Sequence, residues 1–105
     1  MKPGNMQNIM KQAQHMQTEM ARVQEELKDE KIEVSVGGGA VKVVVTGDLV
    51  LSSVTIDAAA VDPDDVSMLE DLITAAVNEG IHQAQDVAGR KMSAVTGGLG
   101  LPGLM

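Results

Sequence analysis

The sequence contains no phenylalanine, tryptophan or tyrosine, although 44% of its 105 residues are hydrophobic. A core must therefore be built from Val, Ile, Leu, Ala and the eight Met residues. These side chains bury less area each than aromatic ones, so we expect further burial through self-association. The missing aromatics also remove the usual stacking surfaces for single-stranded nucleic acid. Binding to the phosphates and groove edges of a duplex stays open.

Cysteine is also absent, which excludes a disulfide framework, a thiolate zinc site and a cysteine nucleophile. No apolar run follows Lys2, so we expect no signal peptide. No window approaches the 18 apolar residues typical of a membrane-spanning helix. We therefore expect a soluble, cytoplasmic protein with no membrane partner.

Motifs of catalysis and cofactor binding are missing as well. The sequence has no GxxxxGK[ST], no GxGxxG after a strand, no HExxH and no GxSxG. His15 and His82 lie in helical patterns without a neighbouring nucleophile. We predict that the protein is not an enzyme and has no cofactor.

The charge is unevenly distributed along the chain. The net charge is −7, yet residues 1–17 carry +2 and residues 87–105 carry +2. The acids gather in between, and residues 61–86 alone carry −7. This asymmetry indicates a polar partner at the two ends of the chain.

The stretch from Met6 to Leu27 has apolar residues at steps that alternate between three and four. This 3.5-residue repeat is the seam of a coiled coil, narrower than the apolar stripe of an ordinary surface helix. It predicts packing against one long helix, from this chain or from a second copy. The seam consists of Met6, Ile9, Ala13, Met16, Met20, Val23 and Leu27.

The methionines of this seam have two possible roles. They can fill a helix interface as flexible apolar side chains, or bind a soft metal through their thioethers. With no cysteine and only two histidines in the chain, we interpret them as packing residues and predict no metal site.

Residues 31–57 change to a period of two, which predicts strands. Gly37 to Gly39 permit the positive φ angles of a tight hairpin. Gly47-Asp48 predicts a two-residue turn, and a shift of phase at Ser52-Ser53 predicts a bulge. The result is a three-stranded antiparallel meander with strands at 31–36, 40–46 and 49–57.

A second long helix is expected after Asp62, with Asp62 as the N-cap and Pro63 at the first helical position. The acids Asp62, Asp64 and Asp65 could instead be considered for calcium or magnesium, but they lack the spacing of an EF-hand loop and capping accounts for them. Gly80 and Gly89 indicate close packing or a fraying end. The apolar face consists of Leu69, Leu72, Ile73, Ala76 and Val77.

These elements predict one α+β domain over residues 1–105, in the order helix, three strands, helix. Residues 1–4 are expected to be flexible. The stretch TGGLGLPGLM, residues 96–105, is rich in Gly and Pro and is also expected to be flexible and not helical.

Four segments in this order resemble the YbaB/EbfC family of bacterial nucleoid-associated proteins. They are MKQAQHMQTEMARVQEEL (10–27), VSVGGGAVKVVVTGD (34–48), DPDDVSMLEDLITAAVNEG (62–80) and TGGLGLPG (96–103). The resemblance implies a tweezer-like homodimer whose helices project from a shared β core. It also implies binding to duplex DNA, a nucleoid location, a role in nucleoid organisation or gene expression, and a possible protein partner in recombination or replication.

In the family the DNA contacts are assigned to the terminal helices, which here correspond to residues 6–18 and the end of the second helix. The side of residues 6–18 away from the seam carries amides and a cation, with no acid before Glu19. Amides and cations can contact phosphates and base edges, although a merely solvated helix face would look the same. The candidate DNA-binding residues are Lys2, Gln7, Asn8, Lys11, Gln14, His15, Arg90 and Lys91.

Four candidate cations per chain, eight in a dimer, are few for a DNA-binding protein. If all eight met phosphates, the log–log salt slope would reach about −7. The sequence therefore predicts weak, mainly non-specific binding that disappears at raised salt. The acidic middle of the chain supports an alternative, a coiled-coil protein-interaction module that does not bind DNA directly.

Overall fold

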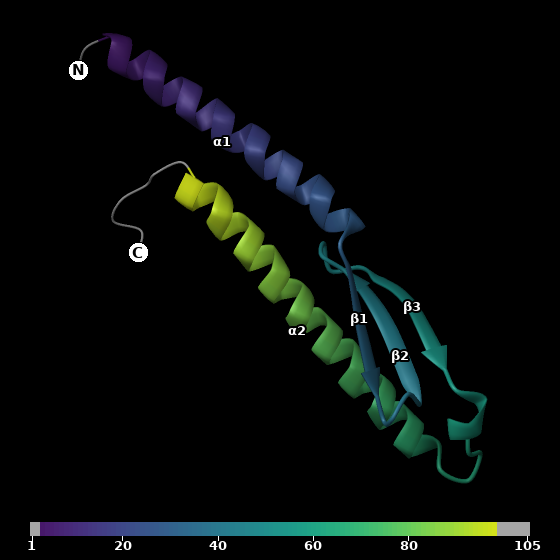
Figure 1. The fold of residues 1–105 in the computed structure, drawn as a ribbon. Helices are drawn as coiled ribbons and strands as arrows, with labels where there is room; N and C mark the ends of the chain where they lie inside the picture. The colour runs from purple at the N-terminus through teal and green to yellow at the C-terminus, as the bar shows by residue number, and fades with distance from the viewer. Residues whose placement is uncertain (1–2, 99–105) are drawn as a thin grey trace.

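The computed structural model describes residues 3–98 and has the predicted α+β order (Figure 1). Along the chain, one long helix precedes the three strands of a small sheet and another follows them. A single 3₁₀ turn lies before the second helix. The elements are α1 (Pro3–Asp29), β1 (Lys31–Val36), β2 (Val41–Thr46), β3 (Leu51–Ile56), η1 (Ala58–Ala60) and α2 (Val66–Gly98).

The three strands form an antiparallel sheet in the order β1-β2-β3, which confirms the predicted meander. Gly37, Gly38 and Gly39 all have positive φ angles in the first hairpin, as expected. The bulge is also confirmed. Val44 pairs with Ser53 and Val45 with Leu51, so Ser52 is the extra residue.

The predicted two-residue turn at Gly47-Asp48 is wrong, because the second hairpin has a loop of four residues. The backbone N–H of Thr46 donates to the carbonyl oxygen of Val50 at 2.8 Å, and the Thr46 hydroxyl donates to the Asp48 carboxylate. Leu49, and not a glycine, takes the left-handed conformation, with φ of 68°. The local bonds of Thr46 and Asp48 thus override the turn that the glycine suggested.

The second helix begins at Val66, so the predicted N-cap at Asp62 is wrong by three residues. Asp65 occupies the capping position, where its carboxylate accepts the N–H of Met68 at 3.3 Å. The Asp62 carboxylate accepts the N–H of Asp64 at 2.9 Å, and the Asp62 carbonyl accepts the N–H of Asp65 at 3.0 Å. Asp62 therefore closes a turn before the helix.

The core lies between α2 and one face of β1 and β2. The predicted apolar face of α2 is confirmed, since its residues are buried in or packed against this cluster. Gly80 also marks close packing, because a Cβ atom there would lie 2.6 Å from Val45 Cγ2. The strand residues of the core are Ile32, Val34, Val41, Val43 and Val45.

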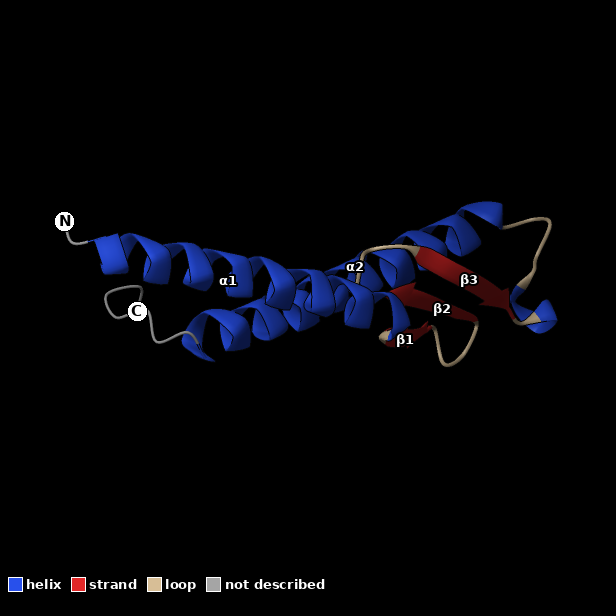
Figure 2. Ribbon diagram, turned by 90° about the horizontal axis from the view of Figure 1, so that it is seen from above, coloured by secondary structure: helices blue, strands red, loops and turns tan. Residues whose placement is uncertain are grey.

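The fold is strongly elongated, with extents of 74 × 24 × 16 Å and a radius of gyration of 20.4 Å. A compact chain of this length would have a radius of gyration of about 13 Å. The molecule is elongated because α1 projects from the sheet, runs antiparallel to α2 and extends past the C-terminal end of α2 (Figures 1 and 2). We call the residues of α1 beyond that end, 6–20, the arm.

The two chain ends depart in part from the sequence expectation. The helix α1 begins at Pro3 and α2 continues through Gly98, so the expectation that residues 96–98 are not helical was wrong. Helical hydrogen bonding outweighs the low propensity of the paired glycines there. Residues 1–2 and 99–105 lie outside the described part of the chain. Neither α1 nor α2, over residues 3–98, is long and apolar enough to span a membrane.

Candidate nucleic-acid interface

The predicted seam of α1 is divided into a packed and an unpacked part. Val23 and Leu27 are buried against Val95 near the end of α2, so part of the expected partner helix comes from the same chain. Beyond this contact α2 ends, and the rest of the seam lies on the arm. Met6 is 56% exposed and Ile9 55%. The structure thus packs the seam only at its sheet-proximal end, with Met16 half-buried and Ala13 and Met20 exposed.

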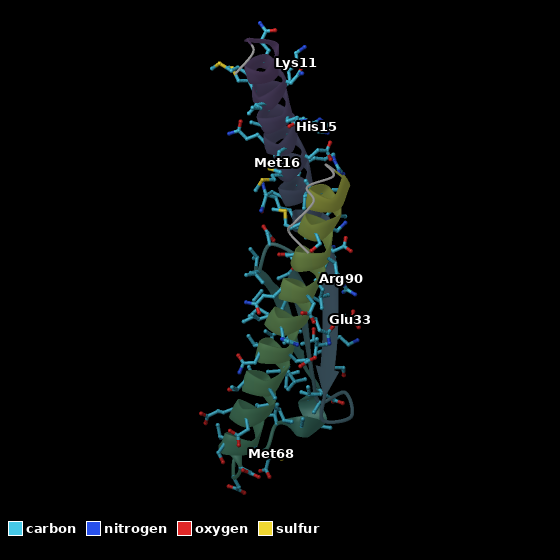
Figure 3. All side chains as sticks on the ribbon, turned by 90° about the vertical axis from the view of Figure 1, so that its left-hand side faces the viewer. Lys11, His15, Met16, Glu33, Met68 and Arg90 are labelled. Carbon is cyan, nitrogen blue, oxygen red and sulfur yellow. The ribbon has the colours of Figure 1, made fainter. Side chains whose placement is uncertain are left out.

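The acid-free face predicted on α1 lies on this arm. Its five candidate residues are all exposed to solvent, and the first acid in α1 is Glu19. Figure 3 shows Lys11 and His15 beyond the end of α2, and Met68 at the opposite end of the molecule. The five residues are Gln7, Asn8, Lys11, Gln14 and His15.

Only some of the cations are free to meet a phosphate. Among residues 3–98, Lys11, Lys31 and Arg90 have no carboxylate within 4.0 Å, whereas the other four cations form ion pairs. Lys31 is the first residue of β1. It follows Lys11 by 20 positions, which is about 30 Å along the direction of α1, so it lies far from the arm. Two of the predicted cations, Lys11 and Arg90, are therefore unpaired. Lys2 lies outside the described residues.

The third predicted cation of the described chain, Lys91, is engaged with an acid of α1. Its Nζ lies 3.4 Å from Glu26 Oε2, and its side chain is only 31% exposed. This ion pair could not be predicted from the sequence, because the two residues are 65 positions apart. A phosphate would have to compete with Glu26 for Lys91.

Arg22 is engaged in the same way. It bonds Glu19 at 2.6 Å and also Glu26. The hydrogen bond from Arg22 lowers the pKa of Glu19, and the Glu19 carboxylate raises the pKa of Arg22. The charge of Arg22 is thus balanced within its own helix, so it adds little to the binding of an anion.

A groove of about 290 Å³ lies between α1 and α2 at this point. It contains both charge signs, so it does not form a basic patch. It is lined by His15, Glu19, Arg22, Val23, Glu26, Lys91, Ala94 and Val95. No group of three or more His, Cys, Asp or Glu residues within residues 3–98 is arranged to hold a metal ion.

The structure does not bring Lys11 and Arg90 together. Since Lys91 contacts Glu26, Arg90 lies near the level of Glu26, which follows Lys11 by 15 positions. At 1.5 Å per residue this is about 22 Å along α1. Figure 3 shows the same separation, with Lys11 near the tip and Arg90 on α2. The arrangement can contact an extended anion at separate points, and does not form a pocket for a small one.

Comparison with known proteins identifies a protein family and several similar proteins. A sequence model of the YbaB/EbfC DNA-binding family matches residues 1–99. A nucleoid-associated protein of Ruminiclostridium cellulolyticum is 54% identical over 102 residues, covering 96% of this chain and 89% of that protein. One from Acetivibrio thermocellus is 55% identical, covering 96% and 90%.

A solved structure shows the same fold. The crystal structure of an uncharacterised protein from Helicobacter pylori matches with a TM-score of 0.63 at 24% identity. The match covers 71% of this chain and 87% of that one. At this identity the likeness is one of fold alone.

Proposed function

The chain belongs to the YbaB/EbfC DNA-binding family, and we propose that it is a nucleoid-associated protein that binds duplex DNA as a homodimer. The binding is weak and mostly independent of sequence. The observation that carries this proposal is the exposed, acid-free face of the arm, with the unpaired Lys11 at its centre. Amides and a free cation on a projecting helix suit contacts to phosphates and groove edges.

The separation of charge along the molecule supports the same proposal. Residues 61–86 carry −7 and run from the turn before α2 to its middle, over the sheet. The arm lies at the opposite end of the molecule (Figure 1). Because charges farther apart than about 8–10 Å are largely screened at physiological salt, DNA held by the arm would feel little repulsion from this acidic region.

The small number of free cations accounts for weak binding. Lys11 and Arg90 are unpaired, whereas Lys91 and Arg22 are balanced by acids. Phosphate contacts dominate affinity in non-specific complexes. Among residues 3–98, these two are the predicted contact cations without an acid partner, and they predict affinity that is measurable at low salt and lost as salt rises.

Self-association is supported by an apolar surface on β3. Val54 and Ile56 pair with Val43 and Val41, whose side chains are buried under α2. Directly opposite residues in a sheet share a face, so Val54 and Ile56 continue the core face beyond the edge of α2. They are nevertheless 40% and 37% exposed. We call Leu51, Val54 and Ile56 the β3 shelf.

A second copy is the partner we propose for the β3 shelf. All six residues of β3 are exposed, and a bare edge strand with apolar side chains is prone to pair with another chain. Val61, Val66 and Met68 add exposed apolar surface beside it. Joining two shelves would leave both arms projecting, which is the tweezer-like arrangement implied by the family.

In this role the protein would act in the cytoplasm, at the nucleoid, in its organisation or in gene regulation. A partner in recombination or replication is part of the same proposal. A different function, a coiled-coil module that docks a protein and never contacts DNA, is favoured by one observation. Three seam residues of the arm, Met6, Ile9 and Met20, are large, apolar and exposed.

A binding assay separates the two functions. A labelled mixed-sequence duplex is titrated at low salt with the wild type, Lys11→Glu and Arg90→Glu, followed by gel shift. We expect a retarded species for the wild type and weaker binding for both variants. Lys42→Glu is the control, since Lys42 is already paired with Glu33 on the sheet at 3.4 Å. No retarded species for the wild type would contradict the DNA-binding function.

A further inference from the structure

The apolar seam of the arm stays open along most of its length. Met6 is 56% exposed, Ile9 55% and Met10, beside the seam, 60%. A groove of about 420 Å³ runs along the same side of α1. Single exposed apolar residues are ordinary, but a continuous row of them marks a contact surface. The groove is lined by Met10, Ala13, Gln14, Met16, Gln17 and Met20.

The other end of the seam already packs against an antiparallel helix. Val23 of α1 packs with Val95 of α2, and the two helices run in opposite directions (Figure 1). Gly98, where α2 ends, follows Val95 by three positions, as Met20 precedes Val23 by three. The helix α2 therefore ends near the level of Met20, and the seam continues beyond it with the same heptad steps.

We propose that the arm of a second copy lies on this open seam, antiparallel to it and in line with α2. Two arms paired in this way are related by a twofold axis, so one apolar surface serves both copies. The seam matches itself in this arrangement. Met6 lies level with Met16 of the second copy, and Ile9 lies level with its small Ala13. Each layer then joins an a position to a d position of the heptad repeat.

The end of α2 selects this register. When Met6 is level with Met16 of the second copy, Pro3 of that copy falls level with Glu19, just past the end of α2 near Met20. A shift of one heptad toward the sheet would drive the second arm into α2. A shift of one heptad outward would lose about half of the paired seam.

Charge does not oppose the pairing. Within residues 6–18, Lys11 is the one Lys, Arg, Asp or Glu residue, and it points about 180° away from the middle of the seam. No unpaired charge is therefore buried. The two Lys11 faces point outward in opposite directions, so the paired arms would hold two separate duplexes. That consequence rests on the proposed DNA binding, whereas the pairing itself does not.

The second copy cannot be the chain that is joined through the β3 shelf. The twofold axis crosses the arms at the level of Lys11, midway between Met6 and Met16. Asp29, the last residue of α1, follows Lys11 by 18 positions, so the two α1 helices end about 54 Å apart. The shelves lie beyond these ends (Figure 1). The seam therefore links one proposed dimer to another.

The contact is small. It involves about 11 residues of each chain, whereas a stable interface has roughly 20–30 residues on each side. The pairing is therefore weak, and is absent from dilute solutions. It forms where the local concentration of arms is high, as in concentrated protein or among dimers crowded on one duplex.

Disulfide trapping in concentrated protein without DNA tests the proposal, since the native sequence has no cysteine. Chains with Met6→Cys and chains with Met16→Cys are mixed in equal amounts and oxidised mildly. Paired arms bring unlike cysteines to one level, whereas like cysteines lie about 15 Å apart along the axis. Random collisions would give unlike and like products in equal amounts. We expect unlike disulfides to exceed like ones about tenfold.

The matched control mixes Gln7→Cys with His15→Cys. These positions are also level in the proposed pair, but they lie on the outer sides of the arms, so we expect slower oxidation and no excess of unlike disulfides. A second pair of variants adds Ile9→Gln to both seam chains. This change removes an apolar layer without adding charge, and should return the seam products to equal amounts.

Three outcomes would overturn the proposal. Equal products from the original seam variants, at the rate of the control, would leave the seam to another occupant such as a foreign helix. A predominance of like disulfides would mean parallel arms. An excess that persists with Ile9→Gln would place the contact outside the seam. Each is distinct from a failure of DNA binding, which the gel shift of the wild type detects separately.

Discussion

Lys91 Nζ lies 3.4 Å from Glu26 Oε2, which joins the end of α2 to α1 through residues 65 positions apart in the sequence. The pair is partly exposed, with side chains 31% and 41% accessible. It has two effects at once. It fixes α2 along α1, and it withholds from DNA a cation that the sequence alone assigns to the binding surface.

Glu26→Gln should therefore tighten DNA binding. The change frees Lys91 and loosens Arg22, and it removes one negative charge near the arm. Because a partly exposed ion pair contributes at most about 1 kcal/mol, we expect a gain of no more than about fivefold in affinity. Fluorescence anisotropy on a labelled duplex at low salt measures it. Glu70→Gln is the control, since it removes the same charge from the first half of α2. An equal gain in both variants would show that net charge alone matters.

Arg22→Gln should leave DNA binding almost unchanged but raise the pKa of Glu19. Arg22 holds that pKa below its ordinary value through a hydrogen bond. The stabilisation by this pair is present above the ordinary pKa of a glutamate, about 4.3, and is lost as pH falls through the lowered value. NMR titration of the Glu19 side chain measures the shift. A large loss of DNA affinity would show that Arg22 is a DNA contact after all.

The two glycines inside α2 should respond oppositely to alanine. A Cβ atom at Gly80 would lie 2.6 Å from Val45 Cγ2, whereas at Gly89 nothing lies within 4 Å. Gly89→Ala should stabilise the fold by up to about 1 kcal/mol through helix propensity. Gly80→Ala should destabilise it, since overpacking costs about 1–3 kcal/mol and exceeds that gain. Denaturant unfolding followed by circular dichroism tests both, and stabilisation by Gly80→Ala would contradict the packing described here.

A charge on the β3 shelf should separate the proposed dimer. Val54→Glu places a carboxylate on the apolar face of β3, and we expect the mass in solution to fall to that of one chain. Ser53→Glu is the matched control, because neighbouring residues on a strand point to opposite faces. Light scattering with refractive-index detection suits a chain without Trp or Tyr. A Val54→Glu variant that stays dimeric would place the interface elsewhere.

The order of elements and the sheet could be predicted because each depends on local sequence. The heptad steps from Met6 to Leu27 determine a helix, and the alternation of valines in residues 41–45 determines a buried strand. The bulge at Ser52 followed from a shift in the same alternation. Boundaries were less certain, because Asp62 and Asp65 are both good caps and only the turn between them decides which one is used.

The sequence could not predict which residues of the candidate site are covered or paired, because this depends on contacts between residues far apart in the chain. The seam predicted a partner helix, but it could not reveal that α2 ends just beyond the contact of Val95 with Val23 and leaves Met6 and Ile9 uncovered. Lys11 and Lys91 look alike in the sequence. Only the fold shows that Lys91 meets Glu26 while Lys11 has no acid beside it.

The central claim is that the protein binds duplex DNA through the free cations Lys11 and Arg90. The most direct test is the salt dependence of binding for the wild type and for Lys11→Gln/Arg90→Gln. A dimer presents four of these cations, so the double variant should lose about 3.6 from the log–log salt slope. Its binding should fall close to zero at low salt. A wild-type complex whose slope is unchanged by the two substitutions would contradict the account.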